Sequence, residues 1–442
     1  MKRFLFFFAF VAFAVGLVSA AEESKPQKIK TGWNFGPLPA VSFSTERGFQ
    51  YGALCEIYNY GDGKVFPGYY HKFNVELSHY TKGSSNLHLF YDSKFLIPGV
   101  RFTAAVSYIP DKMSEFYGFN GDVSVYNKDY DKSDKFDGAG NSLAYYNIRK
   151  DMFRAVADFQ GQIGKLPLNW IAGLAYYDYS VGNVSGKKYE KYKVLENNTL
   201  YSNYVRYGII PESQKDGGSM LDIKAGLVLD TRDHEAAPNK GFCAEAALIG
   251  SFIGRNNPGY LNYMAHWRHY ITLAKNRLVF AYHLAFQGNL MGETPWFALN
   301  NVYTSYFRQI RSEGVGGQNS VRGMMRNRLT ASGYAWANFE MRVKLFEFNL
   351  INQYWYVAAN PFFDLGYITQ TYRMYDQVMA KYNFQDNDFL LVNNMDQNLH
   401  YSAGLGLKIV MNYNFIISAE FAKSFREQDG NTSLAIQLNY IF

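Results

Sequence analysis

The sequence is poor in cysteine, in net charge and in long apolar runs. Only Cys55 and Cys243 occur among 442 residues, which excludes a small fold held together by disulfides. The formal net charge is +6, and removing Lys2 and Arg3 with a leader leaves 42 − 38 = +4, too little to predict nucleic-acid binding. Beyond the first twenty residues there is no run of eighteen apolar residues, so no membrane-spanning helix is predicted.

Motifs of common hydrolases and metalloenzymes are missing as well. The sequence contains no Gly-x-Ser-x-Gly elbow and no His-Glu-x-x-His helix. His266 and His269 are three residues apart, so on a strand they point to opposite faces and cannot share a metal ion. We therefore predict no enzymatic activity, no cofactor and no metal site.

The first twenty residues have the three parts of a secretory signal peptide. Lys2 and Arg3 are basic, residues 4–18 are apolar, and residues 18–20 form a small-residue cleavage site. A transmembrane anchor is the alternative, but the apolar stretch is short for a span. We expect a signal peptide at 1–20, a short periplasmic tail at 21–36 and one transmembrane domain at 37–442, with no room for a soluble module before it.

What the sequence has in abundance is aromatic residues, 37 Tyr and 36 Phe, in segments that alternate between apolar and polar positions. At the C-terminus one face is formed by Leu434, Ile436, Leu438, Tyr440 and Phe442, and the other by Ser433, Ala435, Gln437 and Asn439. Alternation over about nine to eleven residues is typical of strands that face lipid on one side and a polar lumen on the other. An exported, aromatic-rich chain without helical spans is therefore predicted to be an all-β, antiparallel transmembrane β-barrel.

About sixteen such segments can be counted. They begin near Val41, Gln50, Lys72, Asn86, Val100, Met152, Asn169, Met220, Gly241, Leu261, Arg277, Ser332, Asn352, Tyr401, Asn414 and Thr432. The connections alternate between a mostly short set and a set containing four long segments. Long loops on one rim and short turns on the other are the pattern of bacterial outer-membrane barrels with both termini in the periplasm.

The long segment before residue 332 carries Arg322, Arg326 and Arg328 among glycines, in "GGQNSVRGMMRNR". In the strands that follow it, alternation directs Glu340 toward the lumen, and it does the same for Asp364 and Gly366. Two inward carboxylates thus lie on neighbouring predicted strands.

These stretches resemble a known family. "SVRGMMRNR", "WANFEMR" and "FFDLGYI" are similar to the sixth-loop Val-Arg-Gly motif, the inward Glu strand and the Phe-x-Asp-x-Gly strand of BamA/TamA-type outer-membrane assembly barrels, the bacterial surface antigen family. "LDTRDHEAAPNKGF" resembles the family's turn motif, with Asp230, Arg232, Asp233, Pro238 and Gly241 at the matching positions. The resemblance extends over nearly the whole chain after the leader, and the terminal Phe442 suits an outer-membrane assembly signal.

The resemblance implies that the sixth loop folds into the lumen, where Arg322 meets Glu340 and Asp364 and Gly323 allows a tight tip. A guanidinium in a partly desolvated lumen needs carboxylate partners, which it can engage with two parallel hydrogen bonds. The same cluster could instead be a fixed staple for the loop with no moving part, and that alternative remains open.

The sequence departs from the family in two places. Met324 follows the Val-Arg-Gly motif where the family has an aromatic residue. The family's periplasmic POTRA domains have no counterpart before the first predicted strand. We therefore expect a POTRA-less member that works with a periplasmic or POTRA-bearing partner.

Pro37 and Pro39 lie just before the first predicted strand and cannot donate to a strand ladder, so that strand is expected to be short and its seam with the last strand weak. In this family the seam is the proposed lateral gate, and a closed barrel with a ragged first strand is the alternative. The predicted function is insertion or translocation of proteins at the Gram-negative outer membrane, with the lipid bilayer and unfolded outer-membrane proteins as partners and no nucleic acid. A small-solute pore and an accessory subunit of an envelope complex are the other interpretations.

Overall fold

The computed structural model describes residues 29–66, 68–131, 144–184, 199–304, 314–350, 353–372, 397–411, 415–438 and 440–442. The expected signal peptide at 1–20, and the expected tail as far as residue 28, lie outside the described residues.

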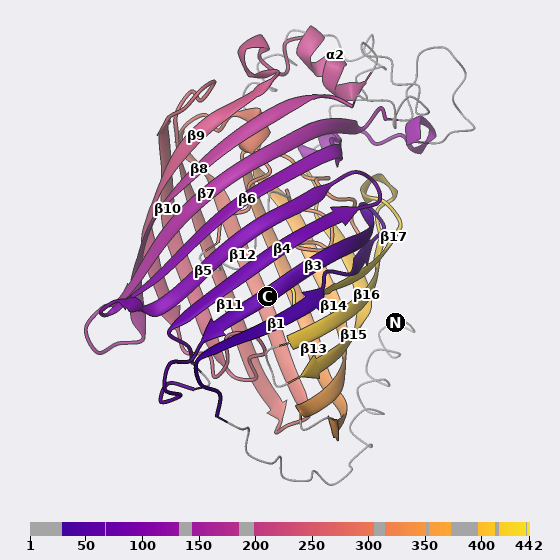
Figure 1. Cartoon of the computed structure of the whole chain (residues 1–442). Coiled ribbons are helices and arrows are strands. Elements are labelled where there is room, and N and C mark those ends of the chain that lie inside the picture. Colours follow the sequence, from indigo (N-terminus) through magenta and orange to yellow (C-terminus); the bar gives the residue numbers. More distant parts are fainter. Residues whose placement is uncertain are drawn as a thin grey trace.

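The described chain is dominated by long antiparallel strands that close into one barrel (Figure 1). The strands are β1 (Trp33–Pro39), β2 (Ser42–Ser44), β3 (Gly48–Asn59), β4 (His71–Tyr80), β5 (Ser85–Ile97), β6 (Val100–Glu115), β7 (Asn147–Gln162), β8 (Leu168–Asn183), β9 (Gly217–Asp230), β10 (Gly241–Ile253), β11 (Tyr260–Ala274), β12 (Leu278–Gly292), β13 (Gly333–Leu350), β14 (Gln353–Gln370), β15 (His400–Met411), β16 (Phe415–Ser424) and β17 (Thr432–Leu438). β1 and β2 both pair with β3 and are two parts of one interrupted strand. The barrel is therefore sixteen-stranded, which confirms the predicted fold class.

Helices are few and short in the described residues. They are α2 (Leu200–Arg206) and the 3-10 turns η1 (Gly121–Val123), η2 (Lys128–Asp131), η5 (Glu212–Gln214), η6 (Trp296–Ala298) and η9 (Glu427–Asp429). None of the helices in this part of the chain has the length and apolar character needed to cross a membrane.

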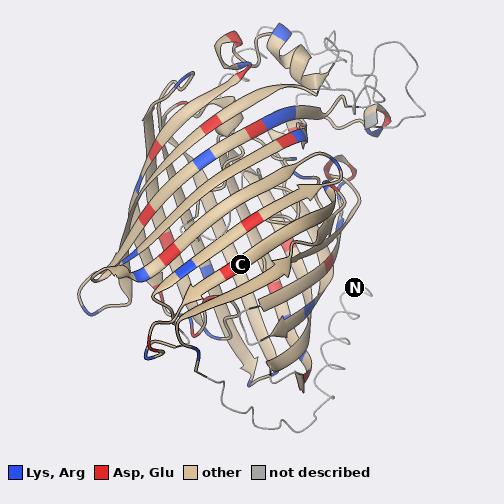
Figure 2. Ribbon diagram, in the orientation of Figure 1, with Lys and Arg blue, Asp and Glu red and all other residues tan. Residues whose placement is uncertain are grey.

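The barrel wall follows the predicted alternation. In β15, Leu405, Leu407 and Ile409 are 44%, 52% and 42% exposed, whereas Lys408 between them is fully buried. Charged residues recur along the strands as well as in the loops (Figure 2). Since a barrel strand points alternate side chains inward and outward, the exposed apolar set faces lipid and the buried polar set faces the interior.

The two ends of the barrel differ. The segments after β6, β8, β12 and β14 meet at one end, which we call the long-loop rim, and the turns after β5, β7 and β11 lie at the other, the short-turn rim. Figure 1 shows α2 at the long-loop rim. Aromatic side chains from four of these segments pack together there: Phe116 lies 5.8 Å from Trp296 and 5.6 Å from Tyr204, and Phe119 lies 4.7 Å from Tyr372, between ring centroids.

The first strand begins at Trp33, inside the range 21–36 that the sequence assigned to the tail, and it contains both prolines. Main-chain hydrogen bonds run from Ala40 N to Gly52 O (3.0 Å) and from Tyr60 N to Gly32 O (2.9 Å). They show that the even-numbered residues of this segment are the ones that hydrogen-bond to the neighbouring strand. Because antiparallel pairs alternate, Pro37 and Pro39 occupy positions whose nitrogen faces away from β3. No hydrogen bond to β3 is lost, so the strand extends through both prolines.

The last strand is shorter than predicted, and the expectation that its outer face continues through Tyr440 and Phe442 is wrong. β17 ends at Leu438, and Tyr440 and Ile441 are each only 6% exposed. The Tyr440 ring lies 3.9 Å from the guanidinium carbon of Arg342, an inward-facing residue of β13. The chain therefore turns toward the interior, where a cation and aromatic rings receive these side chains.

The seam between the first and last strands is brief. β17 pairs with β2 at Ala435↔Ser44 and Ile436↔Phe43, with a main-chain bond from Thr45 N to Leu434 O (3.2 Å) beside them. On its other side, β17 pairs with β16 from Ile417↔Leu438 to Lys423↔Thr432. No register joins β17 to β1 in the described residues. The closing pair of strands is thus the least extensively hydrogen-bonded part of the ring.

Candidate functional site

Residues 314–332, between β12 and β13, fold into a compact loop against inward-facing side chains of the wall. Val315, Val321, Met324 and Leu329 are fully buried and pack with one another and with residues of β13 and β14. Val315 and Leu329 form an isolated antiparallel bridge that closes the base of the loop. The apolar residues of the motif hold the loop together, which leaves its arginines to make the polar contacts.

Arg322 meets Asp364 of β14 through three hydrogen bonds. Its Nε and Nη2 donate to Asp364 Oδ2 and Oδ1, each at 2.8 Å, and its main-chain N donates to Oδ2 at 3.0 Å. Arg322 is only 1% exposed, and Asp364 is fully buried. This is the two-pronged geometry in which arginine binds a carboxylate most strongly.

Two further carboxylates share the remaining nitrogen of Arg322. Nη1 donates to Glu340 Oε1 of β13 at 2.6 Å and to Glu420 Oε1 of β16 at 3.0 Å. The guanidinium carbon also lies 3.5 Å from the centroid of the Phe362 ring. One loop residue therefore links three strands of the barrel wall.

The cluster is neutral as a whole. Glu340 Oε2 accepts from Arg342 Nε at 2.9 Å, and Glu420 Oε1 accepts from Lys408 Nζ at 2.6 Å. The members are the cations Arg322, Arg342 and Lys408 and the carboxylates Glu340, Asp364 and Glu420. Equal numbers of opposite charges in contact offset much of the cost of removing each from water.

Two glycines make room for the loop. Gly366 faces it from β14, and a Cβ there would lie 3.2 Å from Val321 Cγ2 and 3.3 Å from Val315 Cγ1. Gly323 has φ +87°, and a Cβ on it would lie 3.0 Å from the main chain of Lys423. Its main-chain N donates to Ser433 Oγ of β17 at 3.1 Å, so the loop tip reaches the last strand.

The other two arginines of the motif are also bonded. Arg326 donates to Glu115 and Asp111 of β6, at 2.5 and 2.8 Å. Arg328 donates mainly to carbonyl oxygens, at 2.7 Å to Gln428, 2.9 Å to Ser124 and 3.1 Å to Gly121. These contacts join the loop to β6 and to the segments that follow β6 and β16.

The predicted turn motif lies at the opposite end, at the short-turn rim between β9 and β10. Arg232 binds its neighbour Asp230 with Nε and Nη2 at 2.9 and 2.7 Å, and Asp233 Oδ1 accepts from the main chain of Asn239 at 2.9 Å. Gly241 has φ +92° and leaves no space for a Cβ, which would lie 2.3 Å from Thr231 O. Pro238 lines a small cavity at this rim. These contacts shape a turn and are separate from the loop cluster.

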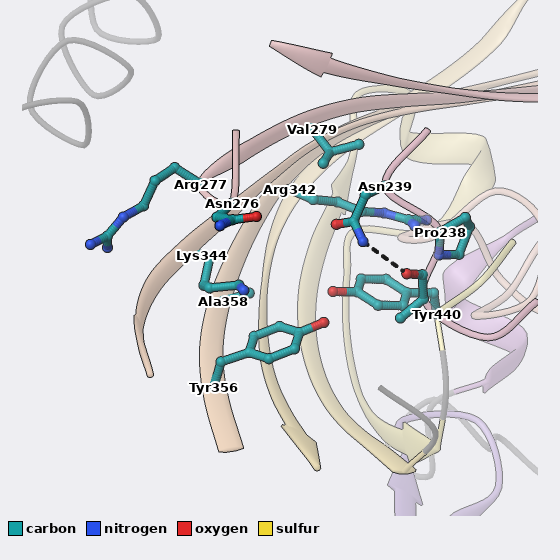
Figure 3. Close-up of a pocket in the computed structure, with 11 residues that line it drawn as sticks. Pro238, Asn239, Asn276, Arg277, Val279, Arg342, Lys344, Tyr356, Ala358 and Tyr440 are labelled. Carbon is teal, nitrogen blue, oxygen red and sulfur yellow. Dashed lines mark hydrogen bonds between the residues drawn. The ribbon is translucent and has the colours of Figure 1, made fainter. Parts of the chain in front are cut away.

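Phe442 lies inside rather than on the lipid face. Its ring centroid is 5.4 Å from His283 and 6.2 Å from Tyr270, and an oxygen of its terminal carboxylate accepts from Arg342 Nη2 at 2.9 Å. Figure 3 shows Tyr440 and Arg342 beside each other on the wall of the cavity that Pro238 also lines. Arg342 therefore touches both Glu340 of the loop cluster and the end of the chain.

The structure brings together Arg322, Glu340 and Asp364, with Gly323 and Gly366 at the contact. Glu420 and Lys408 complete the cluster, and nothing in the sequence paired them with Arg322. His266 was weighed against His269, whereas in the structure its Nδ1 lies 2.9 Å from His283 Nε2, across a strand pair. No group of three or more His, Cys, Asp or Glu side chains in the described ranges is placed to hold a metal ion.

One comparison shows the family of the chain, and the solved structures show its fold. A family model described as the Omp85 superfamily domain matches residues 66–440. Among solved structures, BamA from Haemophilus ducreyi lacking POTRA domains 1–3 is similar with a TM-score of 0.54 and 15% identity, covering 92% of this chain and 70% of that one. CdiB from Escherichia coli is similar with a TM-score of 0.53 and 9% identity, covering 94% of this chain and 64% of that one, so the chain spans less than two thirds of its length. A search of curated proteins gave no match.

Proposed function

Because the chain belongs to the Omp85 superfamily, we propose that it assists the insertion or translocation of proteins at the Gram-negative outer membrane. The observation that carries this proposal is the seam, where β2 and β17 pair over two residues on each strand. The proposed partners are the lipid bilayer, unfolded outer-membrane proteins and a periplasmic protein that delivers them. With both ends of the chain in the periplasm, the long-loop rim faces the outside of the cell.

The seam supports the proposal because it costs little to open. In lipid, each main-chain group left without a partner costs free energy, so the cost of separating two strands rises with the number of hydrogen bonds broken. The seam has two residue pairs, whereas the neighbouring strands β16 and β17 have seven, so the seam costs less to separate. A client segment could therefore enter the wall at this seam more easily than elsewhere.

The loop cluster supports the proposal in a second way. We assign Arg322, Glu340 and Asp364 the role of anchoring the sixth loop inside the barrel, with Gly323 and Gly366 giving it space. Gly323 N reaches Ser433 of β17, and Arg322 reaches Glu420 of the neighbouring β16. An anchored loop would hold the last two strands in shape while the seam beside them opens.

An open pore for small solutes is the weaker alternative. The aromatic side chains at the long-loop rim pack against one another, with Phe119, Tyr204 and Phe297 fully buried. A water-filled pore needs polar or charged side chains along its path rather than a packed aromatic layer.

A disulfide across the seam tests the mechanism. Thr45 and Leu434 form a hydrogen-bonded pair across the seam, so the adjacent pair, Ser44 and Ala435, is a non-hydrogen-bonded pair. The Cβ atoms of such a pair lie close enough together for a disulfide. With Cys55 and Cys243 replaced, Ser44→Cys and Ala435→Cys should remove activity when oxidised and restore it on reduction.

The matched control is the disulfide formed by Ser402→Cys and Ser424→Cys. These serines are also buried, and Phe425 N to Tyr401 O (3.2 Å) shows that they too form a non-hydrogen-bonded pair, between β15 and β16. The control should keep full activity. A seam disulfide that leaves activity intact rules out opening at β2 and β17.

Depletion of the protein followed by quantitative proteomics of the outer membrane tests the function itself. Broad loss of barrel proteins, with precursors in the periplasm, supports general insertion, and loss of one or two proteins supports a dedicated client. An unchanged outer-membrane proteome refutes the proposal and favours a pore or an accessory role, which single-channel conductance then distinguishes.

A further inference from the structure

The edge of β1 that faces away from β3, which we call the seam edge, contains both Pro37 and Pro39. β1 and β2 keep one register against β3, so they follow each other as a single interrupted strand. Just beyond β2, Thr45 N donates to Leu434 O across the seam. Because the main-chain groups of a strand alternate between its two neighbours, the odd-numbered residues of β1 and β2 direct their N and O atoms toward the seam. Both prolines belong to this odd-numbered set.

The register of the seam shows what these two positions would have to bond. If β17 continued straight along β1 in the register of the seam, Tyr440 would lie opposite Pro39, and Phe442 opposite Pro37. Both would be hydrogen-bonded pairs, in which the β1 residue donates its N–H to the carbonyl oxygen opposite. Proline has no N–H, so both donors are missing. Beyond the seam only Val41 keeps an N–H on this edge before the two prolines, so an extended ladder would gain one such donor and then lack two.

The end of the chain turns to a donor in the lumen instead. A straight β17 would leave the carbonyl oxygens of Tyr440 and Phe442 without donors at a lipid-facing wall, which costs free energy. In the structure, Arg342 Nη2 donates to an oxygen of Phe442 at 2.9 Å, and the Arg342 guanidinium carbon lies 3.9 Å from the centroid of the Tyr440 ring (Figure 3). The lumen thus provides a hydrogen bond that the seam edge of β1 cannot provide.

We propose that Pro37 and Pro39 are positioning residues that limit the length of the seam by directing residues 440–442 into the lumen. Each proline removes one donor from the path that β17 would follow along β1, and together they leave the inward turn as the better-bonded arrangement. The consequence for activity rests on the proposed function, whereas the effect on the length of the seam does not.

Disulfide trapping measures the length of the seam directly. Leu38 and Ile441 would lie opposite each other in a straight β17, and they would form a non-hydrogen-bonded pair. Such a pair suits a disulfide, so Leu38→Cys with Ile441→Cys, in the chain without its two native cysteines, reports how often β17 is straight. In the described residues no register joins β17 to β1, so this parent should form the disulfide slowly.

Restoring the donors should lengthen the seam. Pro37→Val with Pro39→Val, added to the cysteine pair, should raise the yield of the disulfide roughly tenfold, because two main-chain hydrogen bonds become available. Each single variant should give part of the increase, which keeps the test open if the double variant folds poorly. Pro110→Val, at a proline of β6, which is not a seam strand, is the matched control and should leave the yield unchanged.

Proteomics of the outer membrane, in cells that carry Pro37→Val with Pro39→Val and the native cysteines, separates this inference from the proposed function. A higher disulfide yield together with loss of barrel proteins supports both. A higher yield with an unchanged outer-membrane proteome supports the role of the prolines and counts against the proposed function. An equal yield in the double variant and the parent, or the same increase from Pro110→Val, overturns the inference.

Discussion

Removing the Arg322 side chain should destabilise the barrel through one orphaned carboxylate. In Arg322→Ala, Glu340 keeps Arg342 at 2.9 Å and Glu420 keeps Lys408 at 2.6 Å, whereas Asp364 loses its ion-pair partner and keeps only hydrogen bonds from the main-chain N of residue 322 and from the Asn338 side chain. Breaking a buried ion pair by removing one partner costs roughly 3–5 kcal/mol. We expect Arg322→Ala, and Asp364→Ala as well, to lower the free energy of unfolding by about that amount.

The double variant separates specific pairing from overall charge. Arg322→Ala with Asp364→Ala leaves two carboxylates paired with two cations, so its cost should be roughly that of one single variant rather than the sum. Arg322→Ala with Glu420→Gln also restores a balanced charge, but it leaves Asp364 without its partner. This second combination should have a free energy of unfolding no higher than that of Arg322→Ala alone.

Urea unfolding of the purified chain in detergent or lipid, followed by tryptophan fluorescence, measures each free energy of unfolding. Migration of the folded, unheated protein in a denaturing gel confirms that every variant forms a barrel. Two results would refute the reasoning. One is a loss of less than about 1 kcal/mol in the free energy of unfolding of Arg322→Ala. The other is an equal free energy of unfolding for the double variants that carry Asp364→Ala and Glu420→Gln.

Two further predictions concern packing and pH. Gly366→Ala should push Val321 by a few tenths of an ångström, lower the free energy of unfolding by about 1 kcal/mol and expose residues 314–332 to protease. In the control Gly36→Ala, the nearest atom to the new Cβ would be at 3.5 Å, so protease protection should be unchanged. Asp122 lies in the segment after β6, outside the spanning strands. Burial alone would raise the pKa of its carboxyl group. Hydrogen bonds from Arg426 at 2.5 and 3.1 Å outweigh burial and hold this pKa below its ordinary value. A depressed pKa means that the stabilisation is present above the ordinary value of about 4 and is lost as pH falls below it. Pepsin cleavage of the wild-type long-loop rim should therefore increase as pH falls through this window, and Asp122→Asn should flatten that increase; an unchanged pH profile in the variant would contradict the assignment.

The fold could be predicted because its signal is local. Each strand repeats an alternation of period two, and Leu405 and Lys408 lie on opposite faces whatever their neighbours are. The ends of the wall could not be predicted in the same way. β1 runs through Pro37 and Pro39 only because those nitrogens face away from β3, and that depends on a register the sequence does not reveal.

The site was predictable in part for a related reason. Alternation predicted the direction of Glu340 and Asp364, and the family resemblance selected both as partners of Arg322. The contact with Glu420 required knowing that β16 curves round to face the loop, which is a property of the closed ring. The sequence around Tyr440 did not predict that the chain turns inward there. An aromatic residue on the apolar face of the alternation can pack against lipid as well as against the guanidinium of Arg342.

The contacts of Arg322 and Arg326 with four strands of the wall have a consequence for the order in which the barrel is completed. Arg322 draws its carboxylates from β13, β14 and β16, and Arg326 draws its own from β6, so these partners come together only when the ring is nearly whole. A loop that entered earlier would bury guanidinium groups without acceptors, at a cost of several kcal/mol for each. We therefore expect burial of the loop to be favourable only after the wall has formed around it.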